Sequence, residues 1–166
     1  MPIKDLLLPE FDQELRKTRT LLERVPDALD KHDFKPHEKS MPMAKLAAHT
    51  AQMPGFLTII LSTSEFDWAK SSIKPLVMQS RAQLLATFDK LSAEAHSFLE
   101  VATDRAMHET WKLSANGHSI YNGSRYFAVR TMFFNHIIHH RAQLGVYLRL
   151  NNIAVPATYG PSADEN

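Results

Sequence analysis

Residues 133–144 read FFNHIIHHRAQL, and two of the histidines, His136 and His140, are four positions apart. On an α-helix this spacing places both imidazoles on one face, where they can share one metal ion. The same face collects apolar residues at helical spacing, namely Tyr126, Val129, Phe133, Ile137, Leu144 and Tyr147. We therefore expect a helix from about Ser124, its N-cap, to about Asn151, with both histidines facing inward.

Three further segments show the apolar periodicity of helices. They are Pro9–Arg24, with Pro9 in the first turn; about Met41 to about Leu61, with Ser40 as N-cap and a kink at Pro54 and Gly55; and about Met78 to about Val101. Polar or irregular connections separate the helices, at Asp27–Ser40, Ser62–Pro75 and Thr103–Gly123. The pairs Asn116-Gly117 and Asn122-Gly123 are turn signals that allow a short hairpin. The pattern predicts an all-α four-helix bundle whose long crossovers permit parallel neighbours.

The composition narrows the function classes. The chain has 166 residues, 44% hydrophobic and 22% charged, so we expect residues 1–166 to form a single domain. Five glycines are too few for a turn-rich all-β fold, and the lack of cysteine excludes a disulfide framework or a cysteine nucleophile. A net charge of +1 without a basic run disfavours a nucleic-acid partner. We expect a cytoplasmic protein with no membrane-spanning segment.

The second predicted helix carries a single histidine, His49. It lies at the edge of an apolar stripe that includes Leu46 and Met53, so it also faces inward. Together with His136 and His140 it supplies three neutral imidazoles from two helices, a set that leaves coordination positions open, as in catalytic sites. The alternative is that these are hydrogen-bonded core histidines. From spacing alone this alternative is favoured, although the cost of burying two adjacent imidazoles without a shared partner strengthens the metal interpretation.

The remaining histidines fall in connections or on polar faces, and we expect them at the surface. They are His32, His37, His96, His108 and His118. His139 is rotated by about 100° from its neighbour His140, so it points toward a partner or solvent.

Five stretches of the chain resemble the DinB-like (DNA-damage-inducible) metalloprotein family, which is distinct from the DNA polymerase that shares this name. They are Leu8–Asp12 (LPEFD), Pro36–Met41 (PHEKSM), Leu46–His49 (LAAH), Asn135–Leu144 (NHIIHHRAQL) and Tyr159–Glu165 (YGPSADE). One departure is Ala142, where many members have glycine; it should be harmless, because alanine is the better helix former.

The resemblance implies a four-helix bundle with up-down-down-up connections. It implies a divalent ion, with nickel or zinc favoured over iron, held by His49, His136 and His140 and open to water. Many members are homodimers, so the resemblance implies a homodimer here. Characterised relatives are often thiol transferases or isomerases that use bacillithiol, mycothiol or glutathione, so the expected partner is a small-molecule substrate that includes such a thiol.

The leading function hypothesis is therefore a metal-dependent thiol S-transferase acting on small electrophiles. A metal-dependent hydrolase is the competing enzyme, disfavoured because neither histidine helix has Asp or Glu beside its ligands. A metal-stabilised binding or regulatory protein is the non-catalytic alternative.

No residue near the histidines is assigned a catalytic role. For Arg141, a surface or dimer salt bridge is favoured over a contact with a substrate carboxylate. Gln143 either supports a ligand or lies in an interface. For Asn135, an outward position together with His139 is favoured over a role in orienting a ligand.

Overall fold

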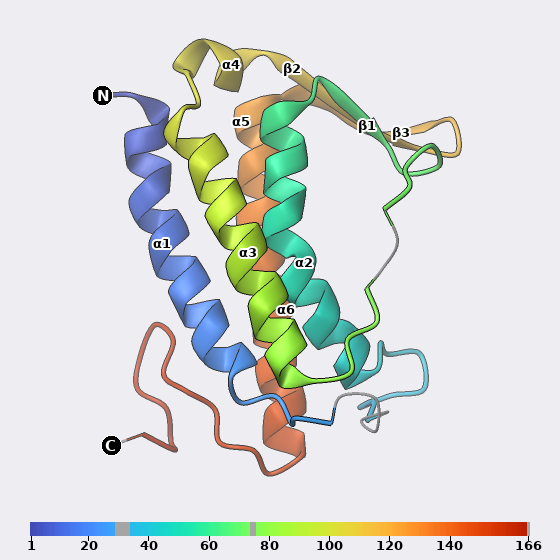
Figure 1. Ribbon diagram of the computed structural model, residues 1–166, viewed down its shortest axis with the longest axis vertical. Helices are drawn as coiled ribbons and strands as arrows, with labels where there is room; N and C mark the ends of the chain where they lie inside the picture. The colour runs from blue at the N-terminus through green and yellow to red at the C-terminus, as the bar shows by residue number, and fades with distance from the viewer. Residues whose placement is uncertain (29–33, 74–75, 166) are drawn as a thin grey trace.

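The structure is a computed structural model that describes residues 1–28, 34–73 and 76–165. Four long helical segments pack side by side (Figure 1). They are α1 (Ile3–Leu22), α2 (Met43–Ser62), α3 (Arg81–Glu100) and a final segment in which α5 (Arg125–Ala128), the π-helical turn η2 (Val129–Phe134) and α6 (Asn135–Leu150) run on without a break. The predicted helical segments are therefore present, and Ser124 caps the last one by accepting a hydrogen bond from the Phe127 N–H.

The core lies between these helices and consists of large apolar side chains. The most completely buried are Trp111, Phe88, Phe133, Phe134, Leu22, Met43, Leu46, Leu57, Ile60, Leu84 and Leu99. Gly55 brings two of the helices close, because a Cβ at this position would stand 3.3 Å from the Leu91 side chain of α3. Helix α2 runs through Pro54 without ending; the kink expected there stays a prediction.

Two helix starts differ from the prediction. Helix α1 begins at Ile3, so Pro9 lies inside it rather than in its first turn. The early start depends on a distant residue, because the Ile3 N–H donates to Asp104 at 2.7 Å and extends the helix onto the short helix α4 (Asp104–His108). Helix α2 has Pro42 as its N-cap, and Ser40 instead closes a preceding turn through its N–H to the His37 carbonyl.

The all-α prediction was incomplete, because the two long connections on either side of α3 form a small sheet at one end of the helices (Figure 1). Strand β2 (Thr110–Ala115) pairs antiparallel with β3 (His118–Ser124), and parallel with the short strand β1 (Glu65–Asp67). The predicted hairpin is confirmed at Asn116-Gly117, whose φ angles of 50° and 79° are those of a tight hairpin turn.

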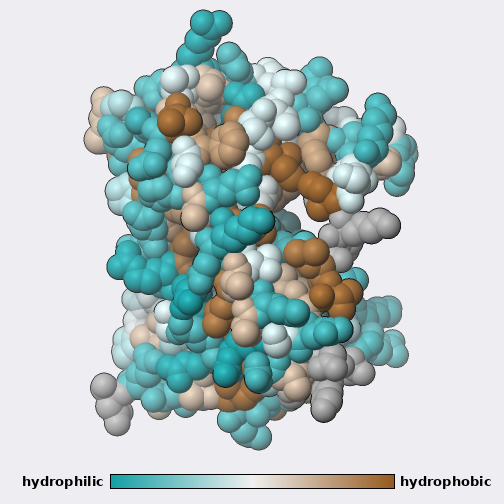
Figure 2. Space-filling view, viewed as in Figure 1, coloured by the Kyte–Doolittle hydropathy of each residue, from teal (hydrophilic) through white to brown (hydrophobic). Residues whose placement is uncertain are grey.

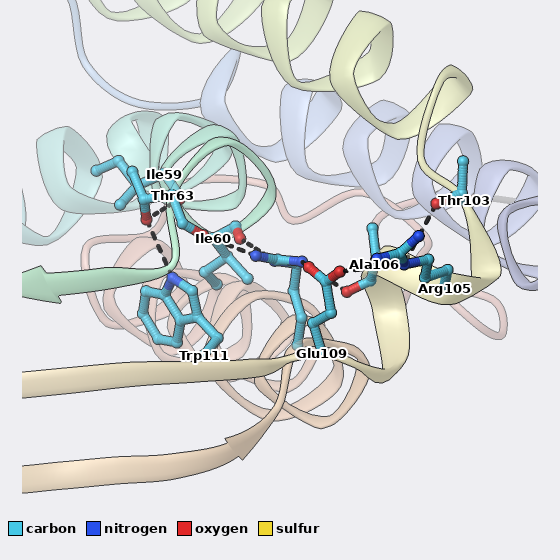
Figure 3. A network of polar contacts seen from close by, with 9 residues as sticks. Ile59, Ile60, Thr63, Thr103, Arg105, Ala106, Glu109 and Trp111 are labelled. Carbon is cyan, nitrogen blue, oxygen red and sulfur yellow. Dashed lines mark hydrogen bonds and ion pairs between the residues drawn. The ribbon is translucent and has the colours of Figure 1, made fainter.

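A buried arginine, Arg125, ties this end of the molecule to the helical segment that carries two of the histidines. Figure 3 labels three of the residues that accept its hydrogen bonds, Ile60, Thr63 and Ala106. Arg125 donates to the carbonyls of Ile60 at 2.9 Å, Thr63 at 2.9 Å and Ala106 at 2.6 Å. These contacts satisfy backbone carbonyls at the ends of α2 and α4, where carbonyls lack the regular intrahelical N–H partner. The start of α5 is thereby held against α2, which supplies the third histidine.

The face shown in Figure 2 is mainly hydrophilic, with isolated apolar side chains. Within the described residues, none of the helices combines the length and the apolar character needed to span a bilayer.

Candidate metal centre

Three histidines from two helices converge in the helical layer. His49 comes from α2, and His136 and His140 come from successive turns of α6. One ring nitrogen of each lies within 4.8 Å of those of the other two. The Nε2 atoms of His136 and His140 are 2.8 Å apart, and the His49 ring centroid lies 4.5 Å from that of His140. The inward orientation predicted for all three is confirmed, and these residues could hold a metal ion.

The outer nitrogen of His140 has its own partner. Nδ1 of His140 lies 2.9 Å from the Gln143 side-chain oxygen, which can accept a hydrogen bond but cannot donate one. With the proton of the neutral ring on Nδ1, Nε2 of His140 keeps its lone pair and faces Nε2 of His136 at 2.8 Å.

This arrangement fits a shared cation. The lone pair of His140 Nε2 and one ring nitrogen each of His49 and His136 gather within 4.8 Å of one another, where one cation can contact all three. Metal-bound imidazoles commonly donate their other N–H to an oxygen acceptor, and the Gln143 oxygen is placed to accept it from His140. The donor set therefore matches what a divalent metal ion requires.

Burial lowers the pKa of all three imidazoles and is the largest cause in each case. The pKa of His140 falls to about 4, with the neighbouring imidazoles adding to the effect of burial and the Gln143 hydrogen bond opposing it. The pKa of His49 is lowered further by the nearby imidazole of His136, through repulsion when both rings are protonated, and by the positive charge of Lys45. At neutral pH all three rings are therefore neutral, the form that binds a metal.

Among the described residues, no Asp or Glu has a carboxylate oxygen within 4.8 Å of all three histidine nitrogens. A metal ion held by three protein ligands would keep coordination positions open for water or a substrate.

The π-helical turn η2 was missed by sequence reasoning, and it corrects the predicted inward face. A π-turn contains one more residue than an α-turn, so residues before it are rotated relative to residues after it. Tyr126, expected inside, is 38% exposed, while Arg125 and Ala128 are buried in its place. No residue in Val129–Phe134 marks such a turn in the sequence.

The residues next to the histidines have mixed outcomes. Asn135 and His139 are exposed, and the His139 ring lies beside that of His140, with ring centroids 5.0 Å apart. Gln143 contacts His140, which confirms that it supports one of the three histidines.

The surface or dimer salt bridge favoured for Arg141, and the substrate contact set against it, are both wrong. Arg141 is 4% exposed and pairs with the buried Glu14 of α1 at 2.6 Å. The Tyr159 hydroxyl, from the C-terminal segment, accepts from Arg141 at 2.7 Å and donates to Glu14 at 2.7 Å. Arg141 follows His140 on α6 and is therefore rotated toward α1, which explains why its side chain is enclosed. The inward position of Glu14 could have been read from its helical spacing with Phe11 and Thr18.

The other histidines lie apart from this centre. His37, His108 and His118 are exposed, as predicted. His96 is only partly exposed, with Asp12 and Glu100 each 3.5 Å from one of its nitrogens. His32 lies outside the described residues.

Comparison with known families gives one match. A family model described as "DinB family" matches residues 1–166 of this chain. No curated protein sequence matches it.

Two solved structures have a similar fold. A DinB-like protein from Bacillus cereus ATCC 10987 superimposes with a TM-score of 0.68 at 17% identity, over 95% of this chain and 98% of its own. A DinB-like protein from Bacillus subtilis gives a TM-score of 0.67 at 16% identity, over 97% of this chain and 99% of its own. At these identities the likeness concerns the fold.

Proposed function

The chain belongs to the DinB family, and we propose that it is a metal-dependent thiol S-transferase acting on small electrophiles. His49, His136 and His140 are the proposed metal ligands, and nickel or zinc is the proposed ion, with iron as a further candidate. The observation that carries the metal site is the convergence of three imidazoles, with two Nε2 atoms 2.8 Å apart and the other nitrogen of His140 facing the Gln143 oxygen.

Ligand chemistry supports this choice of ions. Neutral imidazoles suit zinc, nickel and iron, whereas magnesium and calcium prefer carboxylate and carbonyl oxygens. The described residues place three imidazoles and no carboxylate in the group.

The charge and composition of the site support a thiol substrate. A divalent ion held here would lower the pKa of a bound thiol and so favour the nucleophilic thiolate near neutral pH. Three neutral ligands leave the charge of the ion uncompensated, which favours an anionic substrate group. The chain has no cysteine, so the sulfur would come from a small-molecule thiol.

Hydrolysis is less well supported. A zinc hydrolase of the familiar design needs a carboxylate near the metal to accept a proton from water. None of the causes that shift the three imidazole pKa values is a carboxylate.

The proposal includes an up-down-down-up bundle topology. Contacts of α3 with α1 and α2, and of α6 with the same two helices, support a four-helix arrangement. In Figure 1, α2 and α3 start at one end of the molecule, whereas α1 and the α5–α6 segment start at the other.

We also propose a homodimer made of single-domain chains, with no nucleic-acid or membrane partner. The net charge of +1 supports the absence of a nucleic-acid partner. Light scattering coupled to size-exclusion chromatography would test the dimer.

The transferase proposal is tested with 1-chloro-2,4-dinitrobenzene and bacillithiol, mycothiol or glutathione as separate thiols. In this reaction a C–S bond forms, the C–Cl bond breaks, chloride leaves and the thiol proton goes to solvent. We expect zinc- or nickel-loaded protein to accelerate the reaction above background with at least one thiol. His136→Ala, treated identically, should not. Equal rates for loaded wild type, variant and buffer with all three thiols would count against the transferase.

A further inference from the structure

We propose that Gln143 is a positioning residue that holds His140 in the tautomer needed for metal binding. The inference rests on the metal site of the proposed function. It concerns a residue that would not touch the metal or a substrate, and that acts through the ring of its neighbour one turn earlier on α6.

The geometry assigns the proton on His140. The Gln143 side-chain oxygen lies 2.9 Å from Nδ1 of His140, and this oxygen can only accept. Nδ1 therefore carries the hydrogen of the neutral ring, and Nε2 keeps its lone pair. Nε2 is also the atom that lies 2.8 Å from Nε2 of His136. The hydrogen bond to Gln143 thus fixes both the orientation of the His140 ring and the nitrogen, Nε2, that would bind the ion.

Without the Gln143 oxygen, His140 would lose both its fixed ring orientation and its fixed tautomer. The outer partner of a histidine determines which ring nitrogen is protonated. If Nε2 of His140 were protonated instead, its hydrogen would point at His136 and at the position of the ion. Metal binding would then have to include the cost of moving this proton and reorienting the ring. Changes to such outer partners typically reduce metal affinity by about 10- to 100-fold.

Gln143 is also a practical position to test. The contact with His140 comes from the Gln143 side chain, so a substitution at this position removes the acceptor oxygen directly. Gln143 is exposed on α6, so changing it removes little buried surface. A loss of metal affinity at this position would therefore be separable from a loss of folding.

Three variants form a matched set. Gln143→Met keeps a long unbranched side chain but removes the acceptor oxygen. Gln143→Glu keeps an acceptor oxygen in the same place. Gln13→Met is the control, because it makes the same glutamine-to-methionine change at another exposed glutamine, on α1.

Zinc affinity is measured by competition with a chromophoric chelator, and thermal unfolding is recorded for each metal-free protein. We expect Gln143→Met to bind zinc about 10- to 100-fold more weakly than wild type. Gln143→Glu and Gln13→Met should stay within about threefold of wild type, because neither loses the acceptor at His140. All variants should unfold within a few degrees of wild type.

The tautomer itself is read from ¹⁵N chemical shifts of the histidine rings in metal-free protein. We expect His140 to be protonated at Nδ1 in wild type and Gln143→Glu, and to lose that preference in Gln143→Met. Wild-type zinc affinity and an unchanged His140 tautomer in Gln143→Met would overturn the inference while leaving the metal site intact. A wild type that binds no zinc or nickel would instead overturn the proposed function, and the inference with it.

Discussion

The Nε2 atoms of His136 and His140 face each other at 2.8 Å on successive turns of α6. Two metal-bound imidazole nitrogens at right angles, each about 2.1 Å from the ion, would be about 3 Å apart. The helix therefore presents the two nitrogens at close to the separation that a shared ion needs. The pair needs little rearrangement to bind, and His49 approaches it from α2.

Metal binding should raise the stability of the fold. A ligand that binds the native state alone stabilises it by about 2.7 kcal/mol when its free concentration is 100 times its dissociation constant. We expect zinc or nickel to raise the midpoint of urea unfolding in wild type and to leave His49→Ala unchanged. His96→Ala, which alters a histidine outside the centre, should respond to metal as wild type does. An equal response of wild type and His49→Ala would mean that the ion binds elsewhere.

The buried pair Glu14 and Arg141 should contribute strongly to stability when one partner is removed. Arg141→Met leaves the enclosed Glu14 carboxylate with only the more distant Lys17, at 3.8 Å, as a cation, and breaking a buried pair costs about 3–5 kcal/mol. The double variant Glu14→Leu with Arg141→Met should recover most of that loss, since no unpaired charge stays buried. Urea denaturation measures the free energy of unfolding of wild type, Arg141→Met and the double variant. As a control, Arg149→Ala removes an exposed ion pair and should have a small effect.

A loss below about 1 kcal/mol in Arg141→Met would contradict the enclosed ion pair. A double variant no more stable than Arg141→Met alone would show that packing, rather than charge, sets the loss.

The metal-free protein should lose stability as the pH falls from 6.5 toward 4. The pKa of His140 is lowered from 6.5 to about 4. Between these pH values the imidazole is protonated in the unfolded chain but stays neutral in the native protein. The contribution is present in full above pH 6.5, and about 3 kcal/mol of it is lost by pH 4. The lowered pKa values of His49 and His136 act in the same direction.

This pH dependence is measured by urea unfolding at pH 7.5 and pH 4.5 with a chelator present. His140→Gln should lose less stability than wild type between these values, because the carboxylates common to both proteins cancel in the comparison. Identical pH dependence in the two proteins would show that His140 does not resist protonation in the native state.

Local sequence signals predicted the parts of the fold that depend on near neighbours. Apolar periodicity located the long helices, Ser124 capped the last one, and Asn116-Gly117 formed the expected turn. The missed features depend on distant partners. The start of α1 needs the Asp104 side chain, and the three-residue strand β1 is too short to have a pattern of its own before it pairs with β2.

In the candidate site too, the features set by near neighbours could be predicted, whereas those set by distant partners could not. The four-residue spacing of His136 and His140 predicts a shared face, and the apolar stripe of the second helix predicts that His49 also faces inward. Spacing could place Gln143 near His140, but it could not show which atom the amide oxygen faces. It also could not show that Arg141 is enclosed, because its partners Glu14 and Tyr159 belong to segments far away in the chain.

The most direct test of the metal site is metal content by inductively coupled plasma mass spectrometry. It should use untagged protein, because an added histidine tag binds metal itself, and His136→Ala should be prepared in parallel. Both proteins are incubated with zinc or nickel and freed of unbound metal. We predict about one transition-metal ion per wild-type chain and a large loss in the variant. Wild type without metal after this treatment would contradict the three-histidine centre and leave these residues as parts of the core.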